Sequence, residues 1–150
     1  MTVGSHGTEE ACALPLESST VLKANSGRFL TEASGDYGLS TGSDTQIDAW
    51  TDTCFSITHD GTQGTSPFTS SATAGGTVVP GTFDIREPRF AKWLPVKAGV
   101  TAVAGDAGLA CDLDVTSNLQ SVDPDTTTRA HVKITEVDLV NNMVKVYAVK

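Results

Sequence analysis

Positive charge is scarce in this chain, and it is unevenly placed. Of the 150 residues, 18 are acidic and 10 are Lys or Arg, which gives a formal net charge of −8. No Lys or Arg occurs between Arg28 and Arg86. Because nucleic acid backbones and anionic lipids attract cationic surfaces, this balance argues against both as partners.

Long apolar segments are also missing. No run approaches the roughly 18 apolar residues of a membrane helix, and residues 1–10 lack the basic and apolar regions of a secretion signal. No window carries apolar residues at i, i+3, i+4 and i+7 over the length of a substantial helix. We therefore expect no membrane contact, synthesis in the cytoplasm, and at most one short helix.

Cysteine is rare, and the patterns of known active sites are absent. Cys12, Cys54 and Cys111 are odd in number and far apart, so they do not form a disulfide framework, and reduced thiols are expected. The sequence has no G-x-S-x-G, phosphate loop, H-E-x-x-H or C-x-x-C. We predict no catalytic residues, no enzymatic activity and no cofactor.

Metal sites are recognised in a sequence by the spacing of their ligands. Cys54 and His59 are five residues apart, and a zinc site would have to gather further ligands from distant segments. The pairs Asp112-x-Asp114 and Asp123-Pro124-Asp125 lack the glycine and the distal Glu of a calcium loop. Solvated turns and an exposed strand face explain these carboxylates better, so no metal is expected.

The last twenty residues predict a β-hairpin. Asn141-Asn142 suits a two-residue turn, because Asn tolerates the left-handed backbone conformation. Such a turn would pair Val140 with Met143, Leu139 with Val144, Asp138 with Lys145, and Val137 with Val146. The apolar phase slips near Thr135-Glu136, which indicates a β-bulge.

The rest of the chain alternates in short segments between turn residues. Residues 96–103 and 109–115 predict another hairpin. Residues 60–82 predict a long loop rich in Gly, Ser and Thr, with one weak strand at residues 77–79 as an option. Residues 1–19 have no periodicity and predict an extended arm, whose Leu14, Pro15 and Leu16 would contact a neighbouring subunit; the alternative is an arm packed on the sheet of its own domain. The prediction is a mainly β protein: an arm over residues 1–19, and over residues 20–150 a single β-sandwich or β-barrel domain that ends in the hairpin.

One segment mixes basic and aromatic residues more densely than any other. It contains Arg86, Arg89, Phe90 and Trp93. Arg and Trp are enriched among interface hot spots, so these four residues are our candidate partner interface. The alternative is that the aromatic residues of this segment complete the core while the charges stay in solvent.

Two Gly-containing stretches resemble motifs of a known family. Residues 27–35, GRFLTEASG, are similar to the G-x-F-x-x-S-E-A-N-G stretch of the head-decoration, or cement, proteins of tailed bacteriophages. Residues 96–99, VKAG, with Gly105, Asp106 and Gly108, look like the family's K-A-G hairpins. Residues 21–30, followed by Trp50 and Phe55, also resemble one repeat of a fascin-like β-trefoil, but the chain has no second or third repeat.

The first resemblance implies a function. It implies a non-enzymatic protein that binds the major capsid protein on the outer surface of a virion, stabilises the shell, and assembles as a homo-oligomer, with a trimer as first expectation. Two alternatives remain open: a carbohydrate- or protein-binding β module, and another structural protein of a virion or filament.

Overall fold

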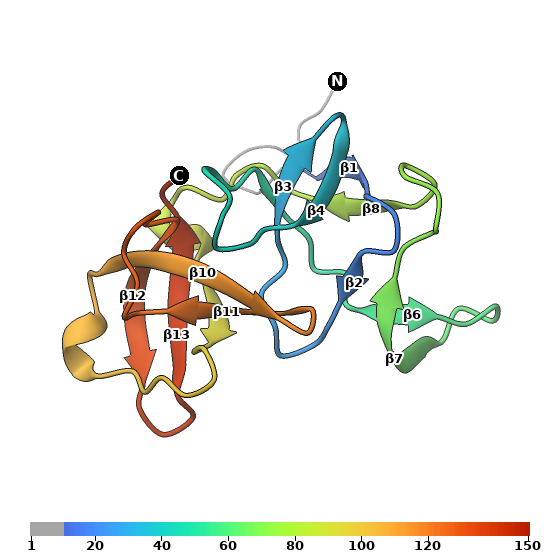
Figure 1. Ribbon diagram of the computed structural model, residues 1–150. Coiled ribbons are helices and arrows are strands. Elements are labelled where there is room, and N and C mark those ends of the chain that lie inside the picture. The colour runs from blue at the N-terminus through green and yellow to red at the C-terminus, as the bar shows by residue number, and fades with distance from the viewer. Residues whose placement is uncertain (1–10) are drawn as a thin grey trace.

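The computed structural model describes residues 11–150, and it is a mainly β protein with two adjoining parts (Figure 1). The first part contains β1 (Cys12–Pro15), β2 (Val21–Leu22), β3 (Phe29–Ala33), β4 (Asp36–Leu39), β5 (Ala49–Trp50), β6 (Phe55–Ile57), β7 (Gln63–Thr69) and β8 (Val78–Gly81). The second contains β9 (Lys92–Pro95), β10 (Ala110–Thr116), β11 (Leu119–Asp123), β12 (Val132–Asp138) and β13 (Met143–Ala148). Two short 3-10 helices, η1 (Pro88–Phe90) and η2 (Ala104–Asp106), flank β9. The prediction of a mainly β fold is confirmed.

The second part is a closed barrel. Its five strands form a sheet in the order β11–β10–β12–β13–β9, in which all neighbours are antiparallel. The two outer strands then meet, because Val96 pairs with Val122 in parallel and the Lys97 amide donates to the Val122 carbonyl over 2.8 Å. A ring with an odd number of strands must contain one parallel pair. Strands β9 to β13 therefore form a barrel, whereas the strands of the first part form separate two- and three-stranded sheets, so the expected single barrel or sandwich does not extend over residues 20–150.

Side chains at alternate strand positions fill the interior of the barrel. On β13, Val144, Val146 and Ala148 are fully buried, while Lys145 and Tyr147 between them are only partly buried. The first part of the chain contributes three further side chains to the same core: Phe29, Ile47 and Trp50. The two parts therefore share one apolar core.

A second, smaller core corrects the predicted arm. It consists of Leu14, Leu16, Leu22, Leu30, Ala49 and Val79. Strand β1 pairs with β8 along its length, and both Leu14 and Leu16 are fully buried. The arm predicted over residues 1–19 is thus wrong from residue 12 onward, because apolar side chains on alternate residues draw this strand into the fold. Residues 1–10 lie outside the described part of the chain.

The carboxyl-terminal hairpin and its bulge are confirmed, but its register is wrong. The ladder pairs Asp138 with Met143, Val137 with Val144 and Glu136 with Lys145, and it shifts between Ile134 and Glu136. Residues 139–142 thus form a four-residue loop instead of a two-residue turn. The reason is the Asp138 carboxylate, which accepts the amides of Val140 at 3.0 Å and Asn141 at 3.1 Å and so closes a wider loop.

Two other predicted segments are also corrected. The stretch 60–82 contains all of β7 and all of β8, so it is not one long loop, although β8 overlaps the weak strand expected at residues 77–79. Residues 109–115 pair with β11 and β12, not with residues 96–103. Strand β10 instead turns at Ser117-Asn118 into β11, and the φ angles of 52° and 63° at these two residues suit a tight two-residue turn.

Candidate interaction surface

The four predicted interface residues separate into a buried and an exposed set. Phe90 is only 2% exposed, so the prediction that it contacts a partner is wrong. Its ring centroid lies 6.1 Å from that of Phe29 and 5.9 Å from that of Trp50, in an aromatic cluster inside the barrel core. Burial of a large ring stabilises the fold more than exposure on a polar surface would. For Phe90, the alternative reading as a core residue holds.

Trp93, unlike Phe90, is exposed on the outside of the barrel. It follows Lys92 on β9, and because strand neighbours face opposite sides, Leu94 is fully buried while Trp93 is 43% exposed. In the ladder Trp93 lies opposite Lys145, whose Nζ is 3.2 Å from a Glu136 carboxylate oxygen. An aromatic ring beside a cross-strand ion pair is thus displayed on a rigid sheet.

We call this surface the outer barrel face. It comprises the outward side chains of three adjacent strands, β9, β13 and β12: Trp93, Lys145, Tyr147, Glu136 and Lys133. Its two Lys residues and one Glu make it locally basic in a chain whose net charge is −8. The face therefore combines an aromatic anchor with charges that suit an acidic partner surface.

The two arginines flank this face from the segment that leads into β9. Arg89 is exposed and pairs with Glu87 at 2.5 Å, an ion pair in solvent that contributes about 0–1 kcal/mol to stability. The exposed Arg86 donates from Nη2 to the carbonyl oxygen of Ile47. Arg86 therefore also fastens the loop before β5, and its substitution would disturb more than a surface.

The expected arm contacts are mostly interior. Leu14 and Leu16 are fully buried, so the prediction that they touch a partner is wrong for both. Pro15, between them, is partly exposed and faces outward. The signal that sequence reasoning missed is the alternation from Cys12 to Leu16, which is typical of a strand.

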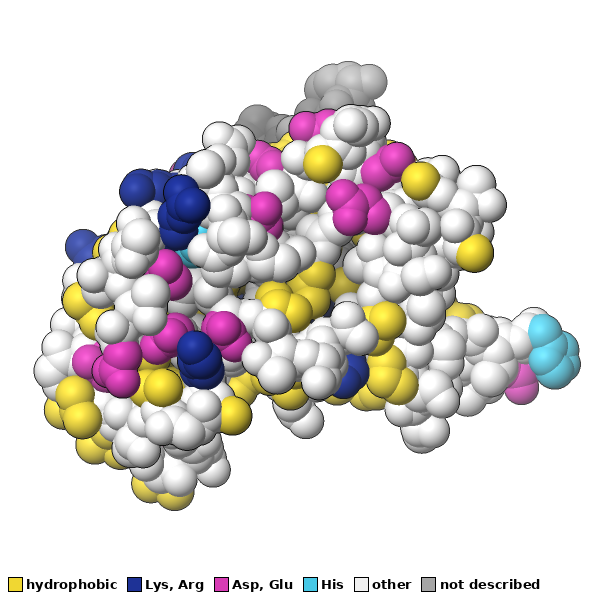
Figure 2. Space-filling model, viewed as in Figure 1, with side chains coloured by type: hydrophobic (Ala, Val, Ile, Leu, Met, Phe, Trp, Pro, Cys, Tyr) yellow, Lys and Arg dark blue, Asp and Glu magenta, His cyan; other side chains and the backbone are white. Residues whose placement is uncertain are grey.

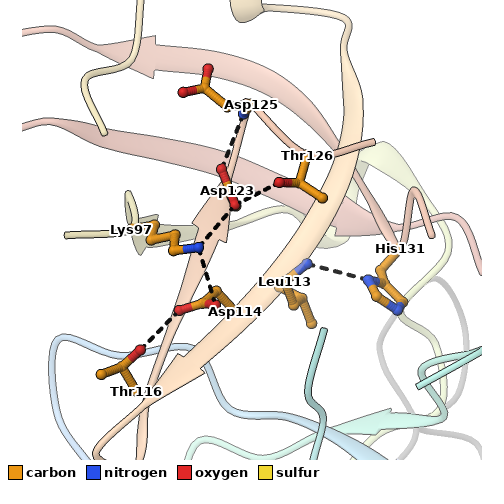
Figure 3. Close-up of polar contacts among 8 residues, drawn as sticks. All are labelled: Lys97, Leu113, Asp114, Thr116, Asp123, Asp125, Thr126 and His131. Carbon is orange, nitrogen blue, oxygen red and sulfur yellow. Dashed lines mark hydrogen bonds and ion pairs between the residues drawn. The ribbon is translucent and has the colours of Figure 1, made fainter. Parts of the chain in front are cut away.

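A polar cluster at the barrel seam was also missed (Figure 3). Lys97 reaches two carboxylates, Asp123 at 3.2 Å and Asp114 at 3.5 Å. Hydrogen bonding to Asp123 is the main cause that raises the Lys97 pKa. Burial alone would raise the pKa of Asp123, but hydrogen bonds from Thr126, Lys97 and the Asp125 amide outweigh it and hold that pKa below its usual value. The cluster therefore links the segment after β9 to β10 and β11, where the barrel closes, through the charges of Lys97, Asp114 and Asp123.

Asp112 differs from the expectation of an exposed strand face. It is 4% exposed, and its Oδ1 accepts the amides of Arg129 at 2.8 Å and Ala130 at 2.6 Å. This carboxylate shapes the loop before β12. Among residues 11–150, no group of three His, Cys, Asp or Glu side chains is arranged to hold a metal ion.

His131 has a structural position. It is fully buried, its Nδ1 lies 3.2 Å from the Leu113 amide (Figure 3), and its Nε2 lies 2.5 Å from the Asp44 carbonyl oxygen. Because the amide must donate, Nδ1 is the acceptor and Nε2 carries the proton. Both ring nitrogens are thus used within the chain, and His131 joins β10 to the loop before β5.

Gln120 joins the barrel to the first part of the chain. Its side chain is fully buried, and Oε1 accepts the Phe29 amide at 2.9 Å. Its Nε2 donates to the carbonyl oxygens of Phe29 at 3.0 Å and Ser40 at 2.8 Å. Gly27 lies so close that an added Cβ would stand 2.2 Å from Gln120 Oε1. No local pattern predicts this contact, because it joins positions 91 residues apart.

Two shallow hollows lie in the first part of the chain. The larger, about 370 Å³, is lined by Ala11, Trp50, Asp52, Thr53, Pro80, Gly81 and Thr82. The smaller, about 230 Å³, is lined by Asp52, Thr53, Cys54, Phe55, Ile57, Gly61 and Gln63. Asp52 and Thr53 line both hollows, so the two lie next to each other.

Comparison with known proteins adds no assignment: no family model, no curated protein and no solved structure matches this chain. In the described part of the chain, no helix has the length and apolar character needed to cross a membrane.

Proposed function

We propose that this chain is a non-enzymatic capsid decoration protein, which binds the major capsid protein on the outer surface of a tailed-phage shell and stabilises it. The observation that carries the proposal is the outer barrel face, where Trp93 is 43% exposed on a rigid strand beside Lys145. A partly exposed Trp flanked by cations is the usual composition of a hot spot for protein binding. An acidic surface on the shell is the partner that this face fits.

The resemblance to cement proteins supports the same proposal. Its two stretches meet the same strand, since Gly27 bridges to Gln120 and Val96 bridges to Val122, both on β11. The first residue of each stretch therefore contacts the same strand of the barrel. A homo-oligomer, with a trimer as first expectation, and a location on the outer virion surface belong to this proposal.

The test is attachment to capsid shells assembled from the major capsid protein of the same genome. Trp93→Ser should lower occupancy roughly ten-fold or more at physiological salt, because it removes the central anchor. Phe83→Ser is the matched control, since Phe83 is 46% exposed but lies outside the outer barrel face. Both variants should melt within a few degrees of the parent protein.

Two results would contradict the proposal. One is no binding of the parent protein to such shells and no rise in their melting temperature. The other is binding of the monomer to a glycan array that Trp93→Ser abolishes, which would favour the carbohydrate-binding alternative. Equal loss of attachment in Trp93→Ser and Phe83→Ser would move the contact away from the outer barrel face.

A further inference from the structure

Aliphatic side chains are exposed at one end of the barrel. Val140 is 92% exposed and Leu139 59% exposed, in the loop between β12 and β13. Val103, 56% exposed, lies at the same end, because the neighbouring Ala102 amide donates to the Asn142 side chain over 2.8 Å. We call Val103, Leu139 and Val140 the apolar tip. Figure 2 shows hydrophobic side chains at this lower end of the molecule.

The apolar tip is held in place by its own loop. The Asp138 carboxylate accepts the amides of Val140 and Asn141, and Asn142 Nδ2 donates to the Val100 carbonyl over 2.8 Å. A loop fixed by hydrogen bonds loses little conformational entropy when it docks. Turns usually carry polar residues, so aliphatic side chains in a fixed turn are suited to contact with an apolar surface.

The apolar tip adjoins the outer barrel face. Outward side chains of neighbouring strands lie in rows across a sheet, and one row of this face contains the ladder partners Trp93 and Lys145. Two residues along each strand, the next row contains Pro95 and Met143, which are also ladder partners and are partly exposed. The β12–β13 loop directly precedes Met143. Apolar side chains therefore follow one another from Trp93 through Pro95 and Met143 to the apolar tip.

The other end of the outer barrel face is basic. The exposed Lys133 is the ladder partner of Tyr147, and the exposed Lys150 lies near it, because the Lys150 amide donates to the His131 carbonyl over 3.3 Å. Figure 2 shows Lys and Arg side chains gathered near the carboxyl-terminal end of the barrel. Tyr147 and Met143 are four residues apart on β13, roughly 13 Å at the rise of a strand. The surface therefore has a basic end and an apolar end.

We propose that the apolar tip is a second part of the capsid contact. A specific interface takes about 20–30 residues on each side, so the five residues of the outer barrel face are too few, and the surface continues toward the tip. The partner is a region of the major capsid protein with carboxylates and an apolar pocket on the order of 15 Å apart, matching the two ends. This inference rests on the proposed attachment to shells and adds the chemistry of the surface that receives the chain.

The experiment measures affinity of the full chain for shells by cosedimentation, from about 50 to 500 mM salt. Val140→Ser should weaken attachment about 5- to 10-fold, by the same factor at every salt concentration, because apolar burial is not screened. Lys133→Gln should instead flatten the salt dependence, because it removes a screened charge. Combining Val140→Ser with Trp93→Ser should multiply their separate effects. Ile57→Ser is the matched control, since Ile57 is aliphatic, 74% exposed and on β6, and should attach like the parent.

Three outcomes would overturn this inference alone. If Trp93→Ser weakened attachment while Val140→Ser and Leu139→Ser attached like the parent, the contact would be confined to the outer barrel face and the proposed function would stand. Binding of the parent to phosphatidylcholine–phosphatidylglycerol vesicles that Val140→Ser abolishes would assign the tip to a lipid surface. A smaller sedimentation coefficient for free Val140→Ser than for the free parent would assign it to contact between copies. Absence of attachment by the parent, in contrast, would refute the proposed function itself.

Discussion

Replacing Gln120 by Met tests whether one buried carboxamide couples the two parts of the fold. Met keeps the approximate volume but removes the three hydrogen bonds to Phe29 and Ser40. The Phe29 amide and the Ser40 carbonyl then lose this partner, while the Phe29 carbonyl keeps the Ser40 amide at 2.9 Å, and each buried group left without a partner costs about 1–3 kcal/mol. After local relaxation we expect a loss of about 3–5 kcal/mol, which for a chain of this size lowers Tm by about 6–20 °C.

A Gln120→Glu variant gives the same prediction a pH dependence. Its second oxygen would face the Phe29 and Ser40 carbonyls, which now accept from Nε2, so the ionised form has no donor to offer them. Burial without a cation raises the folded-state pKa of such a Glu above its unfolded value of about 4.3. The penalty is therefore present at neutral pH and declines as the pH falls through the folded-state pKa, where the protonated acid again donates.

Guanidinium titrations followed by tryptophan fluorescence and far-UV circular dichroism measure both effects. Gln46→Met is the matched control, because the Gln46 side chain is exposed and donates to the nearby Asp48 carboxylate, so its loss should change stability by less than about 0.5 kcal/mol. If Gln120→Met were as stable as the parent, the coupling role of Gln120 would be refuted. A Gln120→Glu variant whose deficit grew on acidification would refute the assigned donor geometry.

Two further predictions concern the barrel. Asp123→Asn should lower stability at pH 7 by about 1–2 kcal/mol, because it removes a charged acceptor of three hydrogen bonds. The Asp123 pKa is lowered by folding, so its contribution exists above the unfolded value of about 3.9 and disappears as the pH falls through the folded value. The Tm gap between variant and parent should thus narrow from pH 7 to pH 2, and a constant gap would contradict this. Burial raises the pKa of Cys111 to about 12, so iodoacetamide at pH 8 should alkylate the partly exposed Cys54 first and reach Cys111 only on unfolding, as mass spectrometry would show.

The sequence alone was enough for the features that depend on neighbouring residues. Alternation along residues 132–148 predicted the hairpin, and the one-residue phase slip near Thr135 predicted the bulge, because side chains of a strand face opposite sides in turn. The absence of any helical stripe predicted the mainly β fold. Leu14 and Leu16, on alternate positions, carry the same strand signal, but Gly4 and Gly7 before them favour an extended arm.

Tertiary structure decided what depends on contacts between distant residues. Phe90 and Trp93 are three positions apart, and both are aromatic. The path of the chain into β9 buries Phe90 in the core and leaves Trp93 on the outer barrel face. The register of the carboxyl-terminal hairpin depends on the Asp138 side chain, because its carboxylate accepts two loop amides and closes a four-residue loop. Barrel closure at Lys97 and the bridge from Gln120 to Phe29 join segments far apart in sequence, and their energies depend on burial that no local window contains.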